Sequence, residues 1–201
     1  RLEGSLLVIR CGVAARPWPR GLVPDGTGRA SDVLIGEALR EGGTGPVWPA
    51  RTRPPETEGE ATNRAIQLAH VAGAALYVVH VSCLEAIEPI ARARAAGWRV
   101  FGETCTQYLF IDESFLEKPG FEGAKYVYTP PPRAKQHQEH LWRALAGDEL
   151  SVVSTDHCPF NWQGQKTLGV GDFSKIPNGG PGIENRLHML HHFGVREGKI
   201  G

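Results

Sequence analysis

The sequence predicts an α/β fold in which crossover helices join the strands of a parallel sheet. The main observation is that short apolar stretches rich in β-branched residues alternate with longer stretches of helical periodicity. A length of 201 residues, with 41% hydrophobic and 22% charged residues, is typical of one soluble globular domain. Lysine and arginine are scattered over a chain of zero net charge, and no apolar run is long enough to span a membrane. We therefore expect a cytoplasmic protein that binds neither nucleic acid nor membranes.

The regular pattern begins at Ser31, which is expected to cap a helix over about 32–41 that ends at Gly42 and Gly43. A proline-rich segment then extends to Glu56. The elements predicted after it are a helix at about 58–71, a strand at 75–80, a helix at 84–96, a strand at 98–102, a helix at 134–146 and a strand at 150–154. Strands and helices alternate throughout this region, as in a parallel βα fold.

Residues 1–30 have a different character. This segment holds five arginines, five glycines and three prolines, and it shows no strand or helix period beyond the short apolar run Leu6 to Ile9. We interpret it as an irregular segment. It is either a solvated arm or, given the abrupt change at Ser31, the product of a reading-frame error or a fusion upstream of the region 31–201.

Two polar residues of metal-ligand type follow strands in equivalent βα units. His80 ends the strand at 75–80, and Asp156 comes just after the strand at 150–154. The carboxyl ends of parallel strands meet at one mouth, where active sites are built, and imidazole and carboxylate are ligands of hydrolytic zinc centres. The structural alternatives are a core histidine bonded to a backbone carbonyl and an Asx-turn or helix-capping aspartate. The occurrence of both residues at strand ends favours a site.

The cysteines and the long glycine-rich loop complete the residue-level interpretation. Cysteines at positions 11, 83, 105 and 158 show neither the spacing of a zinc knuckle nor a disulfide framework, and Cys83 and Cys105 are expected to be small buried apolar residues. The stretch from Gln163 to Gly182 has almost no regular pattern. Because it follows the Asp156 strand, we expect it to be an active-site loop.

Several motifs in order along residues 31 to 201 resemble bacterial D-hydantoinases and dihydropyrimidinases. They are Gly45-Pro46, Thr52-Arg53-Pro54-Pro55-Glu56, Glu58-Gly59-Glu60-Ala61, Val79-His80-Val81-Ser82, Gly102-Glu103-Thr104-Cys105, Gly123-Ala124-Lys125-Tyr126, Ser154-Thr155-Asp156-His157-Cys158-Pro159-Phe160 and Lys175-Ile176-Pro177-Asn178-Gly179. The resemblance implies a zinc-dependent hydrolase of pyrimidine catabolism that opens cyclic amides. It also implies a (β/α)8 barrel of the amidohydrolase type, of which residues 31–201 would form the second half.

The same resemblance implies roles for four residues. His80 and Asp156 would bind zinc, of which the family holds two ions, and Asp156 would also carry the proton from the attacking oxygen to the leaving nitrogen. Thr129, where the family commonly has Ser, and Asn178 would hold the polar edge of the cyclic substrate. Without the resemblance, Thr129 would be interpreted as a strand-end turn residue and Asn178 as a turn residue before Gly179. His157 would point away from the metal and receives no ligand role.

The family's other metal ligands have no counterpart in the chain. Besides the aspartate, the family uses a His-x-His pair, a carboxylated lysine and two later histidines, of which the second corresponds to His80. The first of those later histidines would fall in the stretch Val23-Pro24-Asp25-Gly26. Two ligands do not hold a catalytic zinc, which needs three protein ligands and an open position. We therefore expect a C-terminal-half fragment, inactive by itself, of a cyclic amidohydrolase that is a homo-oligomer, a tetramer in the family. The alternative is a non-catalytic relative that serves in scaffolding or assembly, and an allantoinase or dihydroorotase is disfavoured by the residues from Asp156 to Asn178.

Overall fold

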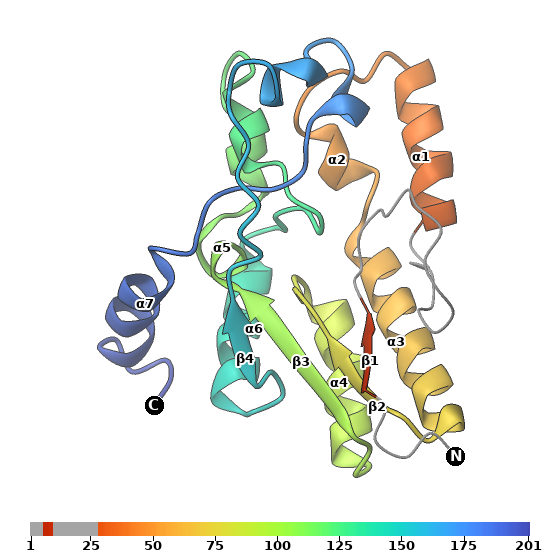
Figure 1. The fold of residues 1–201 in the computed structure, drawn as a ribbon, viewed down its shortest axis with the longest axis vertical. Helices are drawn as coiled ribbons and strands as arrows, with labels where there is room; N and C mark the ends of the chain where they lie inside the picture. Colours follow the sequence, from red (N-terminus) through yellow and green to blue (C-terminus); the bar gives the residue numbers. More distant parts are fainter. Residues whose placement is uncertain (1–5, 10–27) are drawn as a thin grey trace.

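A four-stranded parallel sheet forms the centre of the molecule (Figure 1). The computed structural model describes residues 6–9 and 28–201. The strands lie in the order β1 (Leu6–Ile9), β2 (Ala75–Val78), β3 (Val100–Cys105) and β4 (Val152–Ser154). Leu76 is paired with Val100, and Cys105 is paired with Ser154. The predicted α/β fold with a parallel sheet is confirmed.

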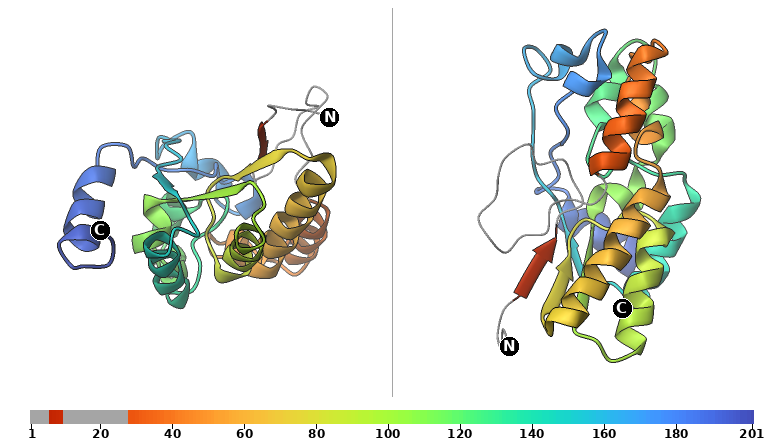
Figure 2. Two further views of the ribbon diagram at one scale, coloured as in Figure 1. Left: turned by 90° about the horizontal axis from the view of Figure 1, so that it is seen from below. Right: turned by 90° about the vertical axis from the view of Figure 1, so that its right-hand side faces the viewer.

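Helices cover one face of this sheet (Figure 2). The helices are α1 (Gly28–Arg40), α2 (Trp48–Arg51), α3 (Pro55–Ala72), α4 (Leu84–Ala95), α5 (Thr106–Phe110), α6 (Gln136–Ala146) and α7 (Arg186–Met189). Four short 3₁₀ helices lie at η1 (Glu113–Glu117), η2 (Glu122–Tyr126), η3 (Lys166–Gly169) and η4 (Phe173–Lys175), and a π-helical segment, η5, spans Leu190–Val195. The covering helices are α3, α4 and α6. No helix among the described residues combines the length and hydrophobicity that a membrane crossing requires.

Local sequence explains the longest helix. Pro55 occupies its first turn, where a missing N–H costs nothing, and Gly73 ends it in a left-handed conformation with φ of 67°. A Cβ atom on Gly59 would lie 2.7 Å from the carbonyl oxygen of Glu85, so glycine is needed for the close approach of α3 and α4. These features fix α3 beside the end of β2.

Two hydrophobic clusters lie on either side of the carboxyl ends of the strands. The first fills the space between the sheet and its helices and includes Leu76, Ile90, Leu141 and Leu150, each at most 1% exposed. The second lies beyond the strand ends, where α1, α2 and the 3₁₀ helices gather (Figure 1), and it is centred on Phe173. The members of the second cluster are Ala38, Leu116, Ala124, Val127, Phe173 and Ile176. Loops between the two clusters therefore carry the strand-end residues.

The sheet face opposite the helices is open. Phe101 and Val152 project from this face and are 42% and 39% exposed. Between them, Glu103 accepts hydrogen bonds from the Tyr77 hydroxyl at 2.6 Å and the Ser154 hydroxyl at 2.8 Å. One carboxylate thus ties β2, β3 and β4 together on a face that no described element covers.

Several element boundaries differ from the predicted ones. Strand β2 ends at Val78 and not at residue 80, β4 begins at Val152, and β3 extends to Cys105 because its last residues pair with β4. Helix α3 begins at Pro55, three residues before the predicted start. The region 1–30, predicted to be irregular, contains β1 and the start of α1, while residues 1–5 and 10–27 lie outside the described residues.

Candidate functional site

His80 and Asp156 both lie just past the carboxyl ends of their strands in a left-handed backbone conformation. Their φ angles are 46° and 42°. Among the described residues only one other non-glycine residue has a positive φ, Asp148, in the turn between α6 and β4. Residues other than glycine rarely adopt this backbone conformation, and those that do concentrate at functional sites. The structure therefore places both predicted ligand residues at strand ends with unusual backbone geometry.

The turn that carries His80 is held by hydrogen bonds to β3. The Val81 amide donates to the carbonyl of Glu103 at 2.8 Å, and the Thr104 hydroxyl donates to the carbonyl of Val81 at 2.7 Å. His80 itself is 3% exposed. The imidazole is thus buried on a segment whose backbone is fixed on one side by the sheet.

A buried ion pair, Glu58–Arg133, fixes the same turn on its other side. The two side chains are 4% and 5% exposed, and Arg133 Nη2 lies 2.8 Å from Glu58 Oε2. Ser82 donates to Glu58 through its amide at 2.8 Å and through its hydroxyl at 2.5 Å, and it accepts from Arg133 Nε at 3.0 Å. Arg133 also donates to the carbonyl of Arg53. Desolvation opposes the charge on Arg133, but the interactions with Glu58, Cys83 and Tyr108 together outweigh it and raise the pKa of the guanidinium.

The Glu58–Arg133 pair also borders the predicted substrate residue Thr129. Glu58, Thr129 and Arg133 line one small cavity of about 10 Å³. The Thr129 hydroxyl is buried and has no hydrogen-bond partner among the described residues. An unpaired buried hydroxyl carries a free-energy cost, which a ligand can remove.

Three segments that carry Thr129, Asp156 and Asn178 lie side by side. The Gly179 amide donates to the carbonyl of Val127 at 2.9 Å, and the Cys158 amide donates to the carbonyl of Gly180 at 3.1 Å. A Cβ atom on Gly179 would lie 2.5 Å from the carbonyl oxygen of Cys158, so only glycine permits this approach. The long loop therefore passes between the other two segments, and Asn178 is exposed on it.

His157 holds the same loop in place. Its Nδ1 accepts from the amides of Gly182 at 3.2 Å and Ile183 at 3.3 Å, and its backbone pairs with Gly180. These contacts give His157 a structural function in the loop. They agree with the absence of a ligand role in the sequence interpretation.

The cysteines near the strand ends are buried thiols. Cys83 and Cys105 are fully buried, as predicted. Burial raises the pKa of Cys105 to about 12, and the carboxylates of Glu103 and Asp156 act in the same direction. Burial also raises the pKa of Cys83 well above its ordinary value. Neither residue is a thiolate at neutral pH, which argues against a role as nucleophile.

The described residues do not by themselves form a zinc site. Nowhere in this part of the chain do three His, Cys, Asp or Glu side chains gather around a common point. His80 follows β2 and Asp156 follows β4, with β3 between them. Two such donors fall short of the three protein ligands that a catalytic zinc requires.

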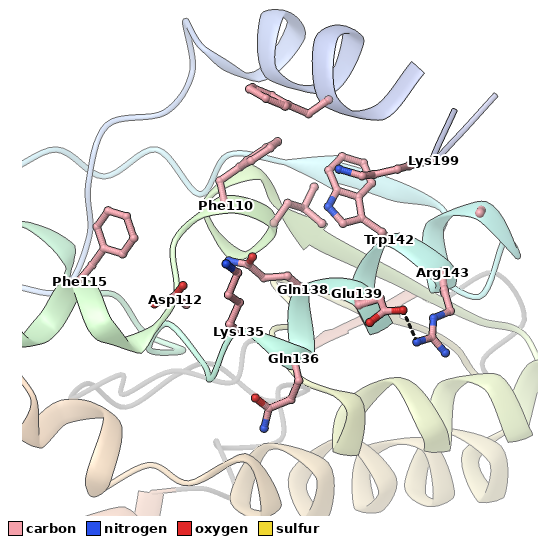
Figure 3. Close-up of a pocket in the computed structure, with 13 residues that line it drawn as sticks. Phe110, Asp112, Phe115, Lys135, Gln136, Gln138, Glu139, Trp142, Arg143 and Lys199 are labelled. Carbon is pink, nitrogen blue, oxygen red and sulfur yellow. Dashed lines mark hydrogen bonds and ion pairs between the residues drawn. The ribbon is translucent and has the colours of Figure 1, made fainter. Parts of the chain in front are cut away.

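A larger cavity lies away from the strand ends, between α5, α6 and the C-terminal segment (Figure 3). Its volume is about 790 Å³, and its walls include Phe110, Trp142 and Phe193. Two of the charged residues on its rim, Glu139 and Arg143, form an ion pair at 2.7 Å. None of the four predicted site residues lines it, so the candidate site is the cluster of strand-end loops.

The sequence interpretation missed three buried or half-buried polar centres around this site. They are the Glu58–Arg133 pair, the Glu103 carboxylate and Lys166, whose side chain is 3% exposed. Charged residues are normally exposed, so composition and periodicity give no signal for a buried one. Glu58 and Glu103 lie inside motifs that carry the family resemblance, which was the only available indication, and Lys166 lies in none of these motifs.

Comparisons with known proteins test the family resemblance. No protein-family model matches the chain. A D-hydantoinase from Geobacillus stearothermophilus is 57% identical over 173 residues, which cover 86% of this chain and 37% of that protein. A dihydropyrimidinase from Arabidopsis thaliana is 45% identical over 158 residues, 78% of this chain and 30% of that protein.

Structural comparison leads to the same family. The crystal structure of a dihydropyrimidinase from Brevibacillus agri superposes with a TM-score of 0.89 at 52% identity, covering 98% of this chain and 40% of that one. The chain thus spans about two fifths of the length of these relatives. By sequence and by structure, the chain belongs to the D-hydantoinase and dihydropyrimidinase family.

Proposed function

We propose that the protein of which this sequence is part hydrolyses the cyclic amide bond of a hydantoin or a dihydropyrimidine. The observation that carries the proposal is the pair of left-handed residues, His80 and Asp156, at the carboxyl ends of β2 and β4. In relatives of this identity the named activities are those of D-hydantoinase and dihydropyrimidinase. A left-handed backbone at two potential ligand residues supports a reaction site, because such conformations concentrate at functional sites.

In this proposal Asp156 is a ligand residue and also carries the proton, and the other three residues have one task each. The Asp156 carboxylate accepts a proton from the water that attacks the ring carbonyl and passes it to the ring nitrogen as the C–N bond breaks. The products are a carboxylate and an open ureido group. Thr129 and Asn178 hold the polar edge of the ring through hydrogen bonds, which the unpaired Thr129 hydroxyl and the exposed Asn178 side chain favour. His80 is a ligand residue.

Zinc is the proposed cofactor, and a bound zinc ion supplies Lewis-acid activation of water and carbonyl. His80 and Asp156 do not fit a complete zinc site, so no step of the proposed reaction is assigned to the metal. The further ligands would have to come from outside the described residues. A half-barrel of a (β/α)8 fold accounts for the open sheet face with Phe101 and Val152 exposed. A cytoplasmic homo-oligomer acting in pyrimidine catabolism completes the proposal.

A graft tests the function. The 173 matching residues of this chain replace the corresponding segment of the Geobacillus stearothermophilus D-hydantoinase, and ring opening of hydantoin and dihydrouracil is followed together with zinc content. We expect the graft to open at least one ring, while the 201-residue chain alone with added zinc stays at the rate without enzyme. A folded, zinc-loaded graft that opens neither ring would overturn the proposal, and turnover by the chain alone would overturn the expectation that its site is incomplete.

A further inference from the structure

Lys166 is a buried charged residue to which the proposed reaction gives no task. Its side chain is 3% exposed although it begins η3 within the glycine-rich loop. Its Nζ donates to the carbonyl oxygen of Pro177 at 2.7 Å and to that of Val127 at 3.2 Å, and it lies 5.6 Å from the centre of the Phe160 ring. Within the described part of the chain no carboxylate forms an ion pair with this ammonium. Its partners are thus two carbonyl dipoles and one aromatic ring.

Both carbonyls belong to the segments that hold the substrate in the proposed function. Pro177 directly precedes Asn178, and Val127 lies in the same short connection as Thr129. The Val127 carbonyl accepts a second hydrogen bond, from the amide of Gly179 at 2.9 Å. The Val127 carbonyl in the Thr129 segment thus accepts hydrogen bonds from the Lys166 ammonium and from the Gly179 amide of the Asn178 segment.

The charge has a cost that packing alone does not explain. Removing an ammonium from water without a carboxylate partner is unfavourable, and burial lowers the pKa of Lys166 to about 8. A methionine side chain would fill a similar space without that cost. What methionine cannot supply is a pair of directed N–H donors, which are stronger when the donor is charged.

We propose that Lys166 is a positioning residue that fixes the separation between Thr129 and Asn178, and thereby the fit of the cyclic substrate. Its ammonium bonds the backbone of both segments at once. The geometry of this clamp stands on its own, while its effect on substrate binding rests on the proposed function. Substrate affinity is then set in part by a residue that does not touch the substrate.

Hydrogen exchange tests the clamp directly. Lys166→Met should raise the exchange rate of the Gly179 amide at least about tenfold, the scale expected for loss of a charge-assisted bond to its acceptor carbonyl. Amides of β3, such as Thr104, should not change. The matched control is Lys135→Met, which removes an exposed lysine. The measurement is made on the 201-residue chain and, in parallel, on the graft.

The graft adds a kinetic readout that a purely structural role would not produce. We expect Lys166→Met to raise KM for the ring substrate by roughly tenfold while kcat changes by less than about threefold, because binding geometry and not the chemical step is disturbed. Lys166→Gln, which keeps a neutral N–H donor group on a shorter side chain, should lie between the parent and Lys166→Met in both readouts. If Lys166→Met raises hydrogen exchange throughout the protein, Lys166→Gln provides the comparison.

The outcomes separate the two proposals. An unchanged Gly179 amide in both Lys166 variants, or equal losses in kcat with no change in KM, would overturn the positioning role. If the parent graft opens no ring but Gly179 exchange rises in Lys166→Met, the function fails while the clamp stands. If the graft is active and Lys166→Met matches Lys135→Met in exchange and KM, the function stands and the clamp fails.

Discussion

Two buried polar centres flank the candidate site, and they differ in how their charge is balanced. At the His80 side, Glu58 and Arg133 neutralise each other at 2.8 Å and share Ser82. At the Asn178 side, Lys166 is held by the carbonyls of Val127 and Pro177. Each centre joins two segments of the site. Only the second leaves a net charge in the interior.

The difference has a physical consequence. A balanced pair is destroyed when one partner is removed, because the remaining charge stays buried without compensation. Replacing a single cation that is held by carbonyls also removes the desolvation cost of burying that cation. The Glu58–Arg133 pair should therefore be important for folding. Lys166 should lower the stability of the fold while its hydrogen bonds fix the geometry of the site.

Removing Arg133 should give the largest effect. Arg133→Met leaves Glu58 buried without its partner, and we expect the free energy of unfolding of the graft to fall by about 3–5 kcal/mol, measured by urea denaturation. The double variant Glu58→Gln/Arg133→Met should recover a large part of the loss, because no charge then remains. If Arg133→Met lost less than about 1 kcal/mol, the pair would not be the stabilising centre described above.

The contribution of Lys166 to stability should depend on pH. Burial lowers its pKa from 10.5 to about 8, so above pH 8 the folded state has released a proton that the unfolded state still binds. The stability of the parent graft relative to Lys166→Met should therefore rise between pH 8 and pH 10.5, by at most about 3 kcal/mol. Cys158 is the titratable group that acts on Lys166, and it raises the pKa.

Urea midpoints of the two proteins, each also in a Cys158→Ser background, give this difference at pH 7 and pH 10. The Cys158→Ser background removes the thiol that acts on Lys166. A difference that stays constant between the two pH values, or one that falls, contradicts a buried lysine with a lowered pKa.

The substrate residues should give the smallest effects. Asn178→Ala in the graft should lower kcat/KM by about 1–3 kcal/mol in transition-state free energy, the usual cost of an unpaired polar partner, with zinc content unchanged. Thr129→Ser is the matched conservative change and should be nearly neutral, since both side chains offer one hydroxyl. Parent kinetics in Asn178→Ala together with zinc loss in Thr129→Ser would show that these residues support the fold and do not bind the ring.

The sequence predicted the fold where local pattern and tertiary structure agree. Leu76 and Val78 alternate with half-buried residues in β2, and the apolar periodicity of α3 faces the core. It missed the carboxyl end of β3, because Glu103, Thr104 and Cys105 have no strand pattern of their own and are extended by pairing with β4.

The site was predictable in part for a similar reason. His80 and Asp156 could be placed at strand ends because their strands are visible in the sequence. Lys166 could not be identified as buried, because its acceptors, Val127 and Pro177, are backbone groups of distant segments. A charged residue in a glycine-rich loop is usually solvated, and only the folded chain brings these carbonyls to it.

The most direct test of the account is the Asp156→Asn variant of the graft, compared with Cys158→Ala. Asp156 is assigned the proton transfer, whereas Cys158 is exposed and lies farther along the same turn. We predict that Asp156→Asn remains folded and loses turnover by about 10²–10⁴-fold, while Cys158→Ala retains most of its activity. Turnover of Asp156→Asn equal to that of the parent graft would contradict the claim that the loops at the carboxyl ends of the strands form the reaction site.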